Sequence, residues 1–167
     1  MPPDALHPSP AAAPLLQVRG LTKHYVLPGN KQFKALNAVS FDLQDGHTLG
    51  IVGESGCGKS TLARTLMRLI DATSGAVDFG GVQWIAPGAR PGREHRRWMQ
   101  MVFQDPFSSL NPKHSIGEVV REPLDIHWTT KTRAERMQRV RELLTMVGLT
   151  ATDADKYPHE FSGGQRQ

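Results

Sequence analysis

Residues 53–61 read Gly53-Glu54-Ser55-Gly56-Cys57-Gly58-Lys59-Ser60-Thr61, and this stretch decides the fold. It matches the pattern G-x-x-x-x-G-K-[ST] of a phosphate-binding loop at every required position. The apolar residues 49–52 precede it and the helix-forming residues 62–69 follow it, so we expect a strand, a loop and a helix in that order. Its glycines let the backbone turn so that consecutive N–H groups converge on phosphate oxygens where the helix begins.

The polar side chains of the loop suit a nucleoside triphosphate. Lys59 would place a cation on the β and γ phosphates, and Thr61 would lie at the α-phosphate end. Ser60 offers a hydroxyl to Mg²⁺, a hard ion that takes oxygen ligands and borrows others from phosphates and water. Cys57 is interpreted as a small loop residue rather than a nucleophile. The loop therefore predicts binding of ATP with Mg²⁺.

Three other interpretations of a glycine-rich stretch fit less well. A turn without a ligand is the plain alternative, but both flanks agree with the strand and the helix that the motif requires. The dinucleotide pattern G-x-G-x-x-G fails because Thr61 stands where its third glycine should be. The glycine loop of a protein kinase carries no lysine of this kind.

Length and composition indicate one ordinary hydrophobic core. The chain has 167 residues, of which 38% are hydrophobic and 22% are charged. No apolar run approaches the length that crosses a membrane, and a single cysteine suits a reducing compartment. The net charge of +4 suits ATP or an anionic membrane surface without demanding either. Residues 1–14 are rich in proline and lack a basic start, so we expect a disordered leader rather than a signal peptide.

Residues 90–97 form a local basic run that would be the place to look for nucleic-acid binding. No aromatic stacking platform and no known nucleic-acid motif accompanies the run. A solvated surface is the simpler interpretation, and no nucleic-acid partner is expected.

The residues ahead of the loop indicate an antiparallel entry sheet. Residues 15–19 and 35–43 alternate or run apolar like strands, and Pro28-Gly29-Asn30 predicts a turn between them. Tyr25 lies in this region, where its ring is either an adenine platform or part of the core.

Two further strands are expected after the loop, over residues 75–79 and 99–103. The second strand would deliver the amide of Gln104 at its carboxyl end, where α/β sheets bind ligands.

The chain becomes helical after Gln104. Residues 115–126 are amphipathic until Pro123 interrupts them, and a capping box at 132–135 opens another helix, which Gly148 ends. One face of that helix is apolar and predicts core packing rather than a cofactor contact. This face consists of Met137, Val140, Leu144 and Val147, broadened by Leu143 and Met146.

A second nucleotide motif, Phe161-Ser162-Gly163-Gly164-Gln165, follows Pro158. Ser162 and the two glycines put a small hydroxyl and bare backbone at an expected helix N-terminus, which is a second anion site. A helix start alone is a weak signal. Together with the phosphate loop upstream it implies one ATP held between two subunits.

The chain resembles the nucleotide-binding subunit of an ABC transporter, and most closely the second ATPase of oligopeptide and dipeptide importers. The resemblance runs from about residue 16 to the end and rests on residues 52–62, 101–112 and 157–167. It implies an α/β P-loop NTPase fold, with a RecA-like core, an antiparallel β entry sheet and an α-helical subdomain. The core would span residues 15–104 and the helical subdomain 105–167, and the second half of the core is lacking.

The resemblance also implies roles for particular residues. Tyr25 would stack on adenine, residues 53–61 would hold the phosphates, and Ser60 with Gln104 would bind Mg²⁺. The residues expected to contact ATP held by the opposite subunit are Phe161, Ser162, Gly163, Gly164 and Gln165. Phe161 replaces the commoner leucine of this motif, which changes packing more than phosphate contact.

The implied partners are a second ABC ATPase subunit, identical or not, and two membrane permease subunits. The permeases would contact the helical subdomain between Asp105 and about Pro123, and a periplasmic or surface peptide-binding protein would act indirectly. The chain would lie peripherally on the cytoplasmic face of the inner membrane.

Members of this family continue into an Asp-Glu pair, a D-loop and a switch histidine, none of which occurs before Gln167. No catalytic residue is therefore assigned within the chain, and we expect inefficient hydrolysis and low stability. Two alternatives stay open within the family: a non-hydrolysing ATP-binding module, and an ATPase for another solute such as nickel. A chromosome-maintenance ATPase fits less well, because the chain has neither heptads nor a zinc-binding cysteine insert.

Overall fold

The computed structural model describes residues 13–103 and 109–166. The chain divides into two compact units, Met1–Met101 and Val102–Gln167. Most of the leader expected over residues 1–14 lies outside the described residues, as does Gln104.

Unit 1 is built on a four-stranded sheet in which every neighbouring pair is antiparallel. Its strands are β1 (Leu16–Leu27), β2 (Lys31–Leu43), β3 (Ser74–Phe79) and β4 (Val82–Ile85), in the order β2-β1-β3-β4. A short 3₁₀ helix, η1 (Arg93–Trp98), follows β4 in the chain. The expected entry sheet is confirmed, and its first two strands are longer than the patterns at 15–19 and 35–43 predicted.

The turn predicted at Pro28-Gly29-Asn30 joins β1 to β2. Gly29 and Asn30 both have positive φ, of 78° and 60°, which suits a glycine and an asparagine. The turn pairs Leu27 with Lys31 and so sets the register of the hairpin.

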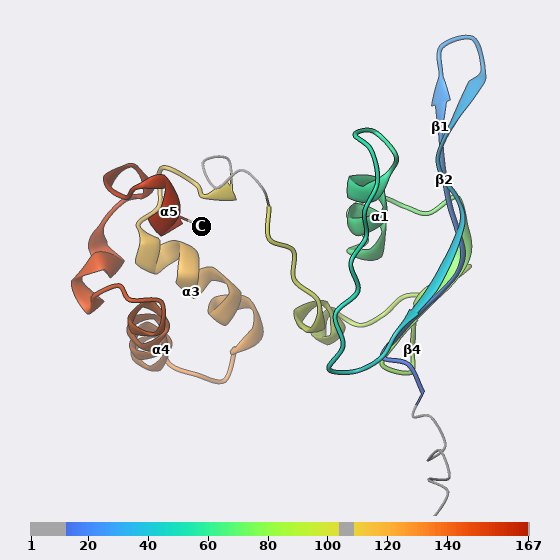
Figure 1. Cartoon of the computed structure of the whole chain (residues 1–167). Helices are drawn as coiled ribbons and strands as arrows, with labels where there is room; N and C mark the ends of the chain where they lie inside the picture. Colours follow the sequence, from blue (N-terminus) through green and yellow to red (C-terminus); the bar gives the residue numbers. More distant parts are fainter. Residues whose placement is uncertain (1–12, 104–108, 167) are drawn as a thin grey trace, which may run out of the picture. The chain divides into compact units, whose positions relative to one another are not determined.

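Helix α1 (Lys59–Leu66) packs on one face of this sheet, as Figure 1 shows. Leu62 lies on its buried side and joins the core cluster of the sheet. That cluster consists of Leu16, Val18, Leu21, Leu36, Leu62, Val77 and Trp84. Trp84 also donates its indole N–H to the carbonyl of Leu66 over 2.6 Å, which fastens the end of α1 to β4.

Helix α1 ends at Leu66, whereas the helix-forming residues 62–69 predicted a helix that continues to Leu69. Arg68 has a positive φ of 54°, and its N–H donates to Thr65 while the N–H of Leu69 donates to Arg64. These two bonds form a Schellman motif, which satisfies the last carbonyls and stops the helix.

Two predicted strands do not form among the described residues. Residues 49–52 belong to no ladder, and Leu49, Ile51 and Val52 are exposed. A buried parallel strand needs a neighbour on each edge. The pairs of this sheet are β2–β1, β1–β3 and β3–β4, all antiparallel, and none of them includes residues 49–52. Residues 99–103 are likewise unpaired, although Met99 is extended, with φ of −133°.

Unit 2 is helical. It contains α3 (Ile116–His127), α4 (Arg133–Met146) and α5 (Gly163–Arg166), with the 3₁₀ helices η2 (Ala151–Asp155) and η3 (Pro158–Glu160) between them. Its buried cluster consists of Ile116, Val140, Leu144, Ala154 and Phe161. Residues far apart in the sequence thus share one small core.

Capping boxes open both long helices. The box predicted at residues 132–135 is confirmed, because Thr132 accepts from the N–H of Glu135 and the Glu135 carboxylate accepts from the N–H of Thr132. The bond from the Thr132 N–H, followed by that from the Lys131 ammonium, lowers the pKa of Glu135 to about 2. Ser115 and Glu118 make the same arrangement at α3.

Two expectations about the helices were wrong. Pro123 does not interrupt α3, which continues to His127 because Val120 and Leu124 pack against the cluster on either side of the proline. The apolar stripe of α4 is narrower than predicted, since Met146 and Val147 are exposed. Gly148 ends the helix as expected.

Candidate phosphate-binding site

The predicted phosphate loop joins the unpaired segment 49–52 to α1. Gly58 is the N-cap of α1, has φ of 102° and has no side chain to cap the helix. A Cβ atom at this position would meet the carbonyl oxygen of Ala35 on β2, so only glycine fits. The first intrahelical bond runs from Leu62 to Gly58 over 2.8 Å, which leaves the N–H groups of residues 59–61 directed out of the helix start.

Lys59 reaches back across the loop. Its ammonium donates to the carbonyls of Gly53 and Glu54, each over 2.7 Å, and lies 3.6 Å from the sulfur of Cys57. The cation is therefore held at the mouth of the loop by two neutral acceptors, which an anionic oxygen can replace with stronger bonds.

A small hollow of about 120 Å³ lies at this helix start. It is lined by Phe33, Ala35, Gly56, Gly58, Lys59, Ser60 and Thr61. The N-terminal end of a helix carries partial positive charge, and the Lys59 ammonium adds a full one. Glu54, Ser55 and Ser60 are exposed, so the hydroxyls are available to a ligand. The hollow thus combines the backbone donors, cation and hydroxyl that bind phosphate.

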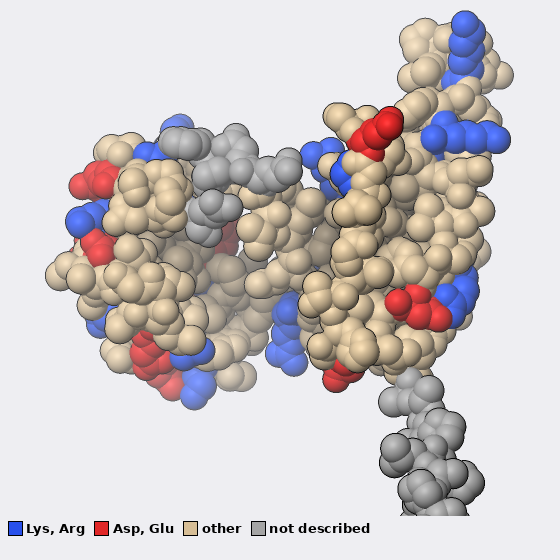
Figure 2. Space-filling view, viewed as in Figure 1, with Lys and Arg blue, Asp and Glu red and all other residues tan. Residues whose placement is uncertain are grey.

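The hairpin β1–β2 places two aromatic rings near this site. Tyr25, predicted from the sequence, is paired in register with Phe33, so both side chains project from the same face of the hairpin. The ammonium of Lys23 lies 5.1 Å from the centre of the Tyr25 ring. Figure 2 shows Lys and Arg side chains along the hairpin, in blue, which favours an anionic ligand.

Sequence reasoning missed Phe33. A signal was present, because the turn at residues 28–30 pairs residue 27 with residue 31 and hence 25 with 33. Starting the second strand at residue 35 concealed this pairing.

The second predicted nucleotide motif, residues 161–165, lies in unit 2. Ser162 caps the short helix α5: its hydroxyl accepts from the N–H of Gln165, and the Gln165 amide oxygen accepts from the Ser162 N–H over 3.0 Å. Phe161 is 5% exposed, and its side chain packs in the core of the unit. Gly163 and Gly164 leave the backbone of the first turn bare.

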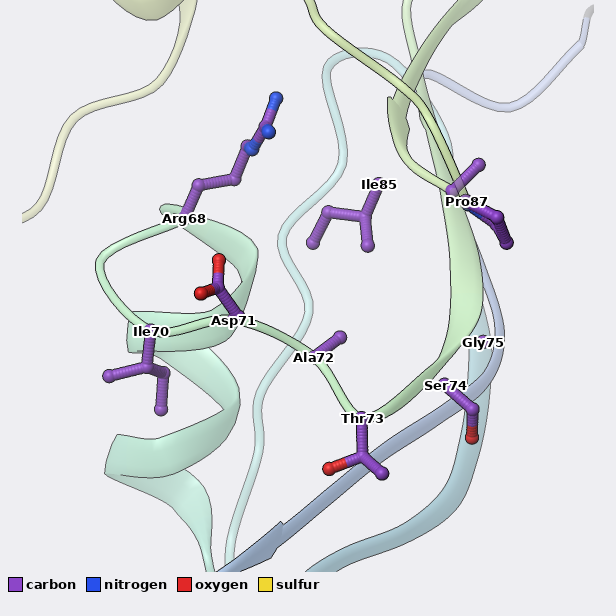
Figure 3. Close-up of a pocket in the computed structure, with 10 residues that line it drawn as sticks. Arg68, Ile70, Asp71, Ala72, Thr73, Ser74, Gly75, Ile85 and Pro87 are labelled. Atoms are coloured by element: carbon purple, nitrogen blue, oxygen red, sulfur yellow. The ribbon is translucent and has the colours of Figure 1, made fainter.

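A larger hollow, of about 410 Å³, lies at the other end of α1 (Figure 3). Arg68, Asp71, Thr73 and Ile85 are among the residues that line it. The C-terminal end of a helix carries partial negative charge and disfavours phosphate. The hydroxyl of Thr73 already accepts from the N–H of His24 over 2.9 Å. The larger of these two hollows is therefore less suited to phosphate than the smaller one at the start of α1.

The predicted site residues fall into two groups. Tyr25 and residues 53–61 belong to unit 1, whereas residues 161–165 belong to unit 2. Gln104, the predicted partner of Ser60 for Mg²⁺, lies outside the described residues. In the described ranges 13–103 and 109–166, no helix is long and apolar enough to cross a bilayer.

Comparison with known proteins gives consistent results. A family model described as ABC transporter matches residues 36–167. The chain is 51% identical to the oligopeptide transport ATP-binding protein OppF of Bacillus subtilis over 154 residues, which cover 92% of this chain and 50% of that protein. It is 46% identical to the di/tripeptide transport ATP-binding protein DppF of Pseudomonas aeruginosa over 158 residues, 92% of this chain and 49% of that one. The chain thus spans about half the length of the curated relatives it matches.

The fold is similar to that of a solved ATP-binding cassette. A dimeric post-hydrolysis state of the cassette MJ0796, bound to ADP and Pi, aligns with a TM-score of 0.73 and 27% identity. The alignment covers 90% of this chain and 65% of the cassette. A second dimeric structure of MJ0796 aligns with a TM-score of 0.74. The predicted α/β class is confirmed by this likeness.

Proposed function

Because this chain belongs to the ABC transporter family, we propose that it is the ATP-binding subunit of a bacterial importer of di- and oligopeptides, or the N-terminal part of one. Binding and hydrolysis of ATP at a two-subunit interface would drive the import. The observation that carries the proposal is the Lys59 ammonium held on the Gly53 and Glu54 carbonyls at the start of α1. The class of cargo is inferred from the relatives, which are named as oligopeptide and di/tripeptide transport proteins.

We assign the phosphates to the loop. When a nucleotide enters, the β and γ phosphate oxygens replace the two carbonyls as acceptors for Lys59, because charged acceptors bind an ammonium more strongly. The N–H groups of residues 59–61 donate to the same phosphates.

The donor set also fits Mg²⁺, which prefers oxygen ligands and keeps several waters. The Ser60 hydroxyl is exposed at the hollow and would be one ligand, with Gln104 as the second. The ion would supply charge neutralisation between the phosphates. Tyr25 would stack on the adenine.

The remaining assignments concern the assembly. Residues 15–104 would form the first part of the nucleotide-binding core and 105–167 the helical subdomain. Ser162, Gly163, Gly164 and Gln165 would contact ATP held by a second ATPase subunit. The helical subdomain would contact two membrane permease subunits on the cytoplasmic face of the inner membrane, and a peptide-binding protein would deliver the cargo.

Replacement of Lys59 in the cells that make this protein tests the proposal. We expect Lys59→Ala to reduce uptake of a labelled dipeptide to background, because the phosphates lose their cation, while uptake of nickel is unchanged. The matched control is Lys131→Ala, which removes an exposed lysine whose ion pair with Glu135 contributes little. Loss of nickel uptake with normal peptide uptake would contradict the assigned cargo.

A further inference from the structure

The hairpin of β1 and β2 extends beyond the sheet to which it belongs. Strand β3 pairs with β1 only between Leu16 and Thr22, whereas β2 pairs with β1 as far as Leu27. Residues 23–34 therefore form a two-stranded ribbon that closes at the turn of residues 28–30. Figure 1 shows this ribbon projecting from the rest of unit 1. A ribbon of two strands is only marginally stable in water, so a contact at its end would support it.

The tip of the ribbon, residues 26–31, exposes aliphatic side chains. Val26 is 71% exposed and Leu27 is 45% exposed. Because the two are neighbours in β1, their side chains point to opposite faces of the strand. Pro28, the first residue of the turn, is exposed as well. The tip is thus apolar on both faces, and only an apolar layer that receives the whole tip would bury these side chains together.

The charged residues of the ribbon are all basic. No aspartate or glutamate occurs among residues 20–41, a stretch that contains Lys23, Lys31 and Lys34. In the part of the chain that the structure describes, no carboxylate forms an ion pair with any of these three lysines. Figure 2 shows Lys and Arg side chains, in blue, at this end of unit 1. Cations without acidic neighbours attract an anionic surface.

The combination of lysines and aliphatic side chains fits an anionic bilayer better than a nucleic acid. Bases of a single strand are held by stacking on aromatic rings, and Val26 and Leu27 offer no ring. The aromatic side chains of the hairpin lie on the side of the nucleotide site, where Phe33 lines the phosphate hollow. A bilayer presents phosphate head groups to lysines and, directly beneath them, an apolar layer to aliphatic side chains.

We infer that the tip of the β1–β2 hairpin docks on the anionic surface of a phospholipid bilayer. The ammonium groups of Lys31 and Lys34 contact the head-group phosphates, and Lys23 adds attraction at longer range. Val26, Leu27 and Pro28 enter the boundary between the head groups and the acyl chains. This contact requires neither a nucleotide nor a permease subunit, so it goes beyond the proposed function and its test is independent of it.

Sedimentation of the full chain with vesicles, without nucleotide, tests this inference. One set of vesicles is phosphatidylcholine with about one third phosphatidylglycerol, and the other is phosphatidylcholine alone. We expect binding to the anionic vesicles to be about a hundredfold tighter, and to weaken as salt is added.

Two variants separate the contributions of charge and apolar contact. Lys31→Gln combined with Lys34→Gln should weaken binding to the anionic vesicles about 25-fold, because each lysine near such a surface contributes about fivefold. Val26→Ser should weaken that binding about tenfold at unchanged charge. All three side chains are exposed, and far-UV circular dichroism checks that the variants remain folded.

The matched control is Lys113→Gln combined with Lys131→Gln, which removes two exposed lysines outside the hairpin and should leave binding within about twofold of the parent chain. Four results would overturn the inference: no binding of the parent chain to the anionic vesicles, equal binding to both kinds of vesicle, parent-like binding of the double hairpin variant, or parent-like binding of Val26→Ser. A duplex oligonucleotide is the last comparison. Tighter binding to the oligonucleotide than to the anionic vesicles, lost in the double hairpin variant, would make a nucleic acid the partner instead.

Discussion

Gly58→Ala is expected to weaken MgATP binding about a hundredfold while leaving the sheet folded. Position 58 has φ of 102°, a conformation that L side chains rarely adopt. The added methyl would also meet the carbonyl oxygen of Ala35. The loop around it is exposed and makes few contacts, so the loop moves away from β2 and the N–H groups at the helix start lose their convergence. Equilibrium binding of MgATP measures the effect, with far-UV circular dichroism as the check on folding.

Gly46→Ala is the matched control for backbone strain. Gly46 also has a positive φ, of 71°, but an added Cβ has no atom within 4 Å, and the residue lies in a turn outside the loop. The left-handed strain of an L residue should cost about 1 kcal/mol of stability and leave MgATP binding intact. Binding by Gly58→Ala within about twofold of the parent chain, the ordinary scatter of such comparisons, would show that the contact with Ala35 does not shape the site.

Trp84→Ala is expected to destabilise unit 1 by about 3 to 5 kcal/mol. The Trp84 side chain is 2% exposed, and its ring packs edge-on against Phe79 with 6.3 Å between centres. Truncation opens a cavity and also leaves the Leu66 carbonyl without the indole N–H that it accepts. This bond fastens α1 to β4. We therefore expect the destabilisation to extend to α1, the helix that carries the phosphate loop. Urea unfolding followed by circular dichroism gives the free energy.

Two further tryptophan variants separate the contributions. Trp84→Phe keeps most of the ring and loses the hydrogen bond, so we expect a smaller loss, about 1 to 2 kcal/mol from the unpaired carbonyl. Trp98→Ala removes a ring that is 45% exposed and should cost less than Trp84→Ala. Equal losses for Trp84→Ala and Trp98→Ala would contradict the anchoring role of Trp84.

Local signals in the sequence predicted the parts of this fold that local chemistry determines. The turn at residues 28–30 and the capping box at 132–135 are short patterns, and both are confirmed because each depends on neighbouring residues alone. The helix after the phosphate loop was predicted for the same reason. Its end at Leu66 was not predicted, since Arg68 adopts the left-handed conformation that usually requires glycine.

Features that depend on distant partners were predicted less well. Residues 49–52 and 99–103 have the composition of strands, yet a strand exists only when another segment pairs with it. The place of Phe33 in the hollow could not be predicted without the register of the hairpin.

The central claim is that a nucleoside triphosphate occupies residues 53–61. Chemical labelling of Cys57 tests this claim most directly. Cys57 is the one cysteine of the chain, is exposed, and lies 3.6 Å from the Lys59 ammonium. The measurement is the rate of alkylation by a bulky maleimide, followed by intact mass, with and without MgATP. At an MgATP concentration of about one hundred times Kd we expect the rate to fall about a hundredfold, with little protection by AMP, which lacks the β and γ phosphates. An alkylation rate that MgATP leaves unchanged would contradict the account.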